Sequence, residues 1–166
     1  MKLIWTRSKL PLSVLIRWFL NSDCSHFAIV FKSRDGGLMF ESNLLGTHPK
    51  FFKTALKHMT VVHEIELDMT DDEENAAWDM IVDQVDGLGY NYRGFAYFTY
   101  RAFLKKLFRI PLPPSNPWSQ SGTYLCEQVL ASVAGPLHIS ISADLSMLSP
   151  EDHFHLTQAW ISRGVV

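Results

Sequence analysis

A histidine and a cysteine about a hundred residues apart each lie where a polar segment changes into an apolar one. His26 begins a nearly continuous apolar run, which predicts a strand over residues 26–32 that is buried on both faces. Cys126 follows a polar loop and precedes an apolar stretch, which predicts a helix that begins at Tyr124 or Leu125 and ends before Gly135. A fold that satisfies both patterns presents a thiol at a helix start and an imidazole at a strand start, with the histidine earlier in the chain.

This pair of residue types is typical of nucleophilic catalysis through a thioester. A free cysteine has a pKa near ~8.5, and the unpaired N–H groups and the dipole of a helix N-terminus stabilise its thiolate. The same N–H groups can hold the oxyanion of a tetrahedral intermediate, each contributing about 3 kcal/mol. Cys126 is therefore a candidate nucleophile and His26 a candidate base. Structural roles remain as alternatives for both, as a small buried side chain and as a hydrogen-bonded histidine.

Glu41 is the leading candidate for the group that orients the histidine. Turn-forming residues at 34–37 predict a hairpin, and the returning strand over residues 38–42 then brings Glu41 beside His26. A histidine that acts as a base needs such a partner to fix its tautomer. The alternative for Glu41 is an exposed carboxylate at a strand end. Two weaker candidates for the same role are Ser42 and His63.

The remaining patterns predict an α+β fold in one domain over residues 1–166, with a small antiparallel sheet packed on helices. Thr70 and Glu73 have the spacing of a capping box, so the acidic residues there indicate a helix start rather than a metal site. The other expected elements are a strand at 3–5, a helix at 12–20, a strand at 61–67, helices at 71–86 and 95–108, a proline-rich loop at 110–123 and a helix start at 149–152. Residues 137–141 fit either a strand or a loop.

Composition and charge exclude several classes of protein. A hydrophobic fraction of 47% and a charged fraction of 19% are typical of a globular chain. The net charge of −2, without a basic stripe, argues against nucleic-acid binding. Two cysteines do not make a disulfide framework at this length. Neither a signal peptide nor an apolar run of about 18 residues is apparent, so we expect a soluble protein, cytoplasmic or phage-encoded.

No cofactor and no metal site are expected, because the residues that could bind a metal lack the paired spacing of a zinc site. These residues are Cys24, His48, His58 and His63. We expect Cys24 to be structural. His153 and His155 flank Phe154 at a helix start, and we expect both histidines to be exposed to solvent.

Aromatic residues concentrate in the helix expected at 95–108, where helical spacing makes most of them core residues. A minority could form a hydrophobic wall that receives an acyl or lipid chain. The apolar residues over 12–20, with Arg17 to one side, leave attachment to a membrane surface as a weaker option.

An ordered set of segments over roughly residues 12–155 carries a family resemblance. The segments are residues 15–18 and 25–30, Phe40-Glu41-Ser42 with Gly46, residues 88–92, residues 124–129 and residues 148–152. Together they resemble the permuted papain-like proteins related to the NlpC-type cysteine hydrolases, a group that includes the YiiX-like proteins and, more distantly, the lecithin–retinol acyltransferases. The run Cys126-Glu127-Gln128 departs from the common Cys-Ser-Glu pattern of that group.

The resemblance implies a circularly permuted papain-like fold in which Cys126 attacks, His26 is the base and Glu41 orients it. We expect the oxyanion to rest on the Cys126 N–H and the Tyr124 hydroxyl. The implied activity is that of a peptidase, amidase or acyltransferase that cleaves an amide or ester bond in a peptide, cell-wall or lipid-linked amide substrate. The alternative function is a catalytically silent papain-like module that binds a lipid or protein partner.

Overall fold

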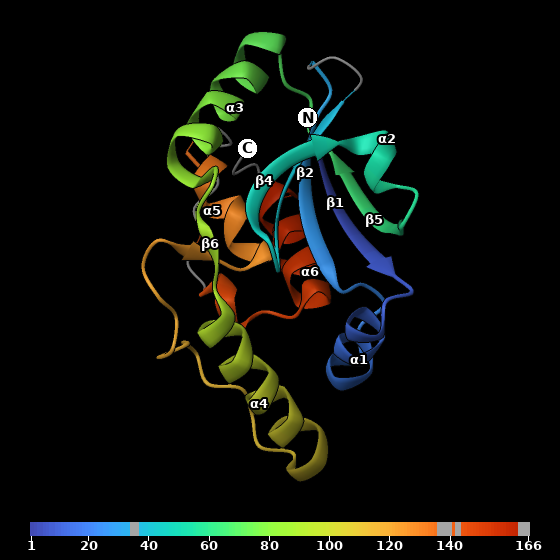
Figure 1. Ribbon diagram of the computed structural model, residues 1–166, viewed down its shortest axis with the longest axis vertical. Helices are drawn as coiled ribbons and strands as arrows, with labels where there is room; N and C mark the ends of the chain where they lie inside the picture. The colour runs from blue at the N-terminus through green and yellow to red at the C-terminus, as the bar shows by residue number, and fades with distance from the viewer. Residues whose placement is uncertain (34–36, 136–140, 142–143, 163–166) are drawn as a thin grey trace.

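The chain folds around a five-stranded antiparallel sheet with the strand order β4-β3-β2-β1-β5 (Figure 1). The structure is a computed structural model, and it describes residues 1–33, 37–135, 141 and 144–162. The strands of the sheet are β1 (Lys2–Ser8), β2 (His26–Phe31), β3 (Leu38–Asn43), β4 (Gly46–Phe51) and β5 (Met59–Glu66). A separate parallel pair joins β6 (Gly89–Tyr90) to β7 (Thr123–Tyr124). The α+β class and the antiparallel sheet are thereby confirmed.

Helices cover both faces of this sheet. The helices are α1 (Pro11–Leu20), α2 (Phe52–Ala55), α3 (Asp71–Val85), α4 (Tyr92–Phe108), η1 (Cys126–Gln128), α5 (Val129–Val133), η2 (Leu145–Met147) and α6 (Pro150–Ser162). In Figure 1, α3, α5 and α6 lie on one side of the sheet, α2 lies on the other, and α1 and α4 lie at one end of it. The site described below lies at that end.

Side chains alternate between the two faces along β1, β2 and β3, as the pleat of a strand requires. The larger core combines strand and helix residues that include Leu3, Trp5, Phe27, Ile29, Phe40, Ile81, Val85, Leu130 and Trp160. The smaller core, on the opposite face, contains Ile4, Ala28, Val30, Met39 and Ala55. The expectation that the strand at 26–32 is buried on both faces is therefore confirmed.

Some elements differ from the expected ones for identifiable reasons. Helix α4 begins at Tyr92, three residues earlier than expected, because Asn91 caps it: its Oδ1 accepts the Gly94 N–H at 2.8 Å. Strand β4 was not predicted, since Pro49 interrupts it, but an edge strand tolerates a proline. The capping box of Thr70 and Glu73 is confirmed at the start of α3. Of the predicted turn at 34–37, residues 34–36 lie outside the described residues, as do all but Ile141 of the segment 137–141.

The turn between β3 and β4 approaches the chain before β6 very closely. Gly46 has a φ of +106°, and a Cβ there would lie 2.8 Å from the backbone oxygen of Leu88. The neighbouring Thr47 N–H donates to that same oxygen at 2.9 Å, and the Gly87 N–H donates to the Thr47 oxygen at 3.0 Å. Only glycine combines this backbone conformation with this contact.

The expectation that His153 is exposed is wrong, whereas His155 does lie at the surface. His153 is 0% exposed on the sheet-facing side of α6, and its Nδ1 accepts the Trp5 Nε1–H at 3.1 Å. Nε2 must then carry the proton of the neutral ring, and among the described residues it has no hydrogen-bond partner. Burial lowers the pKa of His153 to about 3, so the ring stays neutral in the folded protein.

We predict that His153 makes the protein less stable in mild acid. The unfolded chain takes up a proton on this ring as the pH falls through 6.5, whereas the folded chain takes it up only near pH 3. The free energy of unfolding therefore falls with pH across that interval, by up to about 1.4 kcal/mol per pH unit. His153→Gln keeps an acceptor for Trp5 but cannot titrate, so urea midpoints between pH 7 and roughly 4 should depend less on pH in this variant. Parallel pH profiles for the two proteins would show that the prediction is wrong.

Candidate functional site

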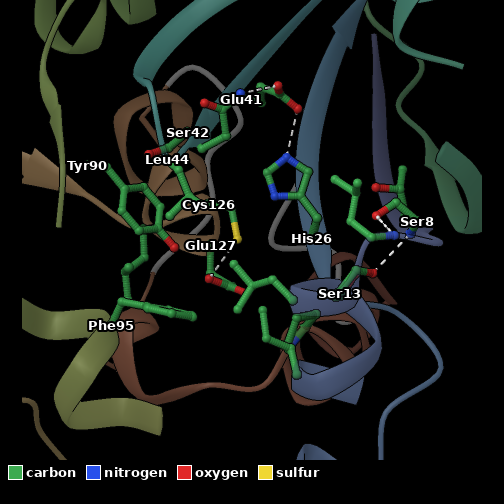
Figure 2. Close-up of a pocket in the computed structure, with 18 of the residues that line it drawn as sticks. Ser8, Ser13, His26, Glu41, Ser42, Leu44, Tyr90, Phe95, Cys126 and Glu127 are labelled. Atoms are coloured by element: carbon green, nitrogen blue, oxygen red, sulfur yellow. Dashed lines mark hydrogen bonds and ion pairs between the residues drawn. The ribbon is translucent and has the colours of Figure 1, made fainter. Parts of the chain in front are cut away.

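A cavity of about 400 Å³ opens at the end of the sheet that carries α1 and α4 (Figure 2). Its polar residues include Ser13, His26, Glu41, Ser42, Lys50, Tyr90, Cys126 and Glu127. Its apolar residues include Leu10, Leu12, Ile16, Leu20, Leu44, Leu45, Met59, Phe95, Phe98 and Leu125. The predicted nucleophile, base and orienting residue therefore lie around a single apolar cavity.

Glu41 is a buried carboxylate surrounded by donors from three strands. His26 Nε2 lies 2.8 Å from Oε2, the Asn43 amide donates to Oε1 at 2.6 Å, and Lys50 forms an ion pair with Oε1. The side chain is only 1% exposed. Burial by itself would raise the pKa of Glu41, but the hydrogen bonds and positive charges of His26 and Lys50 outweigh it and hold this pKa at about 2. Glu41 is therefore ionised at neutral pH, and the alternative of an exposed carboxylate does not hold.

The bond to Glu41 determines which nitrogen of His26 is available as a base. An ionised carboxylate only accepts hydrogen bonds, so His26 Nε2 must carry the proton that it donates to Glu41. In the neutral ring, Nδ1 then has the free lone pair. Figure 2 shows this second ring nitrogen on the side of His26 that faces the Cys126 sulfur. The arrangement suits transfer of a proton from sulfur to Nδ1.

Cys126 is the first residue of the short helix η1, which continues into α5. The turn is held at its start by Gln128, whose Oε1 accepts the Leu125 N–H at 2.8 Å. The Cys126 thiol donates to Glu127 Oε2 at 3.1 Å, and its residue is 7% exposed. Burial, followed by the charge of Glu127, raises the pKa of Cys126 well above its usual value, against a backbone hydrogen bond from Phe27. In this state the sulfur is a neutral thiol rather than a thiolate.

Two residues beside the sulfur were not predicted as site residues. Glu127 is 5% exposed, and burial raises the pKa of its carboxyl against the hydrogen bond from Cys126 and the charge of His26. The Tyr90 hydroxyl points toward Cys126 and Glu127 in Figure 2, and burial, with the nearby Cys126 and Glu127, raises its pKa, so it remains a donor. The sequence contains two signals for these residues. Glu127 is adjacent to Cys126, and Tyr90 lies in the segment 88–92 that carries the family resemblance.

The other sequence candidates lie in different places. Tyr124 pairs with Tyr90 across the β6–β7 ladder, but it packs against the larger core and is not among the residues that line the cavity. Ser42 lines the cavity, and its hydroxyl donates to the Tyr124 backbone oxygen at 2.8 Å, so it does not orient His26. His63 lies outside the cavity and pairs with Glu151 at 2.9 Å. Nothing in the structure tests the expected oxyanion role of Tyr124, which stays a prediction, whereas Tyr90 lines the cavity beside Cys126.

Comparison with known proteins does not assign this site. No protein-family model matches the chain, and neither a curated protein nor a solved structure matches it. Within the part of the chain that the structure describes, every helix is too short or too polar to cross a bilayer.

We predict that Glu127→Gln makes Cys126 more reactive. Removing the carboxylate removes a negative charge that disfavours the thiolate, and each unit by which the pKa falls gives about a tenfold higher thiolate fraction. The measurement is the rate of alkylation by iodoacetamide at neutral pH, followed by mass spectrometry in a Cys24→Ser background.

The matched control for that experiment is Glu64→Gln, which removes an exposed carboxylate that pairs with Lys2 on the sheet. Its alkylation rate should equal that of the Cys24→Ser parent. Equal rates for Glu127→Gln and the parent would rule out control of the thiol by Glu127.

Proposed function

We propose that this chain is a cysteine-dependent hydrolase or acyltransferase that cleaves an amide or ester bond through a thioester. The observation that carries the proposal is His26, which is bonded through Nε2 to the buried, ionised Glu41 and has its other nitrogen toward the Cys126 sulfur. A nucleophile, a base and an orienting group in this relation are the working parts of thiol catalysis. We further propose that the fold is a circularly permuted papain-like one, since the histidine strand β2 precedes the cysteine helix η1.

In the proposed reaction, a substrate carbonyl enters the cavity next to the sulfur. The Cys126 thiol turns from Glu127 to His26 and gives its proton to Nδ1, while Glu41 stabilises the resulting imidazolium. Sulfur attacks the carbonyl carbon, and the oxyanion is held by the Cys126 N–H and the Tyr90 hydroxyl. The imidazolium then protonates the leaving group. Water, or another acceptor deprotonated by His26, releases the acyl group from sulfur.

The cavity favours an acyl group with an apolar chain. Leucine, isoleucine and phenylalanine side chains from α1, α4 and the β3–β4 turn form most of its walls, whereas the polar groups gather beside Cys126. Such a division suits a substrate with one reacting carbonyl and one apolar chain. Among the expected substrates, lipid-linked amides and esters therefore fit better than polar peptides.

The first test is labelling of the thiol by an activated acyl ester. Wild type should form a thioester at Cys126 that Cys126→Ala cannot form, and His26→Gln and Glu41→Gln should slow its formation by roughly 10²–10⁴-fold, the usual contribution of general base catalysis. Intact-protein mass spectrometry measures the rate. Cys24→Ser is the matched control and should label normally. Equal labelling rates in wild type and His26→Gln would contradict the proposed pair.

A second prediction concerns chain length. Ile16→Trp fills the cavity, so hydrolysis of a long-chain p-nitrophenyl ester should fall more than hydrolysis of the acetate. Val14→Trp, on the exposed side of the same helix, is the matched control and should leave the ratio of the two kcat/KM values unchanged. A fall of equal size for both esters in Ile16→Trp would exclude the cavity as the acyl site.

The second candidate function is a silent module that binds an apolar ligand. The thiol bond to Glu127 and the raised pKa of Cys126 favour it, because a resting sulfur of this kind is a poor nucleophile. Under this function an acyl ester would not label Cys126 faster than Cys24, although a fatty acid would still bind in the cavity. The labelling experiment therefore separates the two functions.

A further inference from the structure

A second group of reactive side chains lies outside the cavity. Cys24 precedes β2, His63 lies in β5, and Glu151 is in the first turn of α6, so three separate parts of the chain meet here. The ligand atoms of these residues all lie within 4.8 Å of one another. The proposed reaction does not use this combination of a thiol, an imidazole and a carboxylate.

The spacing of these atoms is close to that of ligands around a tetrahedral metal ion. Cys24 Sγ lies 3.5 Å from Glu151 Oε2, and His63 Nε2 lies 2.9 Å from Glu151 Oε1. Ligands bound at about 2.0–2.3 Å from a tetrahedral ion lie about 3.3–3.8 Å from one another. Shifts of about 1 Å or less in the three side chains would bring their ligand atoms to these distances.

The surroundings fix the side chains in position. The His63 ring stacks on Phe154 with the ring centroids 4.1 Å apart and the planes 5° from parallel. A bulge in the β1–β5 ladder falls next to His63, where such an irregularity changes the direction of a side chain. The Asp23 N–H donates to Glu151 Oε2 at 3.2 Å. The stacking and the Asp23 hydrogen bond therefore hold two of the three side chains in place before any ion binds.

We propose that Cys24, His63 and Glu151 bind a zinc ion. A thiolate, an imidazole and a carboxylate are all ligands of Zn²⁺, whereas the sulfur disfavours Mg²⁺ and Ca²⁺. Cys24 is 0% exposed, while the side chains of His63 and Glu151 are 25% and 24% exposed, so an ion can enter from solvent. Binding displaces the thiol proton of Cys24 to solvent and leaves a neutral His63 bonded through Nε2.

The fourth ligand is a water molecule or His155. His155 lies one turn along α6, and its Nε2 is 3.7 Å from Glu151 Oε1. Its side chain is 65% exposed. The ion would join Glu151 at the start of α6 to His63 in β5 and to Cys24, which precedes β2. Its binding does not depend on the proposed reaction.

The test is direct binding of metal by the full-length protein. Purified, metal-free wild type should bind one equivalent of Zn²⁺ in competition with a chromophoric chelator, and its Tm should rise with Zn²⁺. Cys24→Ser and Glu151→Gln should each weaken binding by more than about a hundredfold, since loss of an outer-shell partner alone costs about 10–100-fold. Co²⁺ should give a thiolate charge-transfer band that Cys24→Ser abolishes.

Two controls identify the site. Cys126→Ser and His58→Gln leave the three proposed ligands in place and should bind Zn²⁺ as wild type does. If Cys126→Ser abolishes binding, the ion belongs to the cavity and the proposal fails. It also fails if wild type binds no Zn²⁺, or if Cys24→Ser and Glu151→Gln, each shown to be folded by circular dichroism, both bind as tightly as wild type.

Discussion

The buried negative charge of Glu41 determines how β2, β3 and β4 are arranged at the end of the sheet that borders the cavity. The Glu41 carboxylate is almost inaccessible to water, and its partners come from β2, β3 and β4. An uncompensated charge in such a place costs several kcal/mol, so these strands must pair in the register that supplies all three donors. The same requirement places the His26 ring, since one of those donors is its Nε2. The register of β2, β3 and β4 and the position of the His26 ring therefore depend on the same contacts with Glu41.

Two carboxyl groups on either side of the thiol and imidazole have pKa values shifted in opposite directions. Glu41, with three donors, has a pKa of about 2, whereas burial raises the pKa of Glu127. Divergent pKa values in neighbouring groups are typical of sites that move protons. Glu41 suits a permanent counter-charge for His26, whereas burial, followed by the charge of Glu127, raises the pKa of Cys126 and keeps its thiol neutral. In this state the Cys126 thiol donates to Glu127 rather than to His26.

Sequence patterns predicted the parts of this arrangement that depend on local order. Alternation and turn residues were enough to place Glu41 beside His26, and loop-to-helix transition placed Cys126 at a helix start. The ion pair of Lys50 with Glu41 could not be predicted, because Pro49 interrupts the strand pattern of β4, which carries Lys50. The burial of His153 depends on which side of α6 meets Trp5. Cys24 and His63 approach each other because β2 and β5 flank β1, and Glu151 joins them only through the packing of α6 against the sheet. Contacts of this kind between distant segments leave no periodic signal.

The close approach at Gly46 has a consequence for how the cavity could diversify. Backbone hydrogen bonds join the start of β4 to the residues before β6. Leu44, Leu45 and Tyr90 therefore lie on two backbone segments that are held together. The positions of these residues around the cavity are then set by the main chain, while their side chains set the local chemistry. Leu45 is 89% exposed, so its side chain could be replaced without disturbing these backbone hydrogen bonds. Ligand selectivity could accordingly change at Leu44 and Leu45 while the arrangement of His26, Glu41 and Cys126 stays the same.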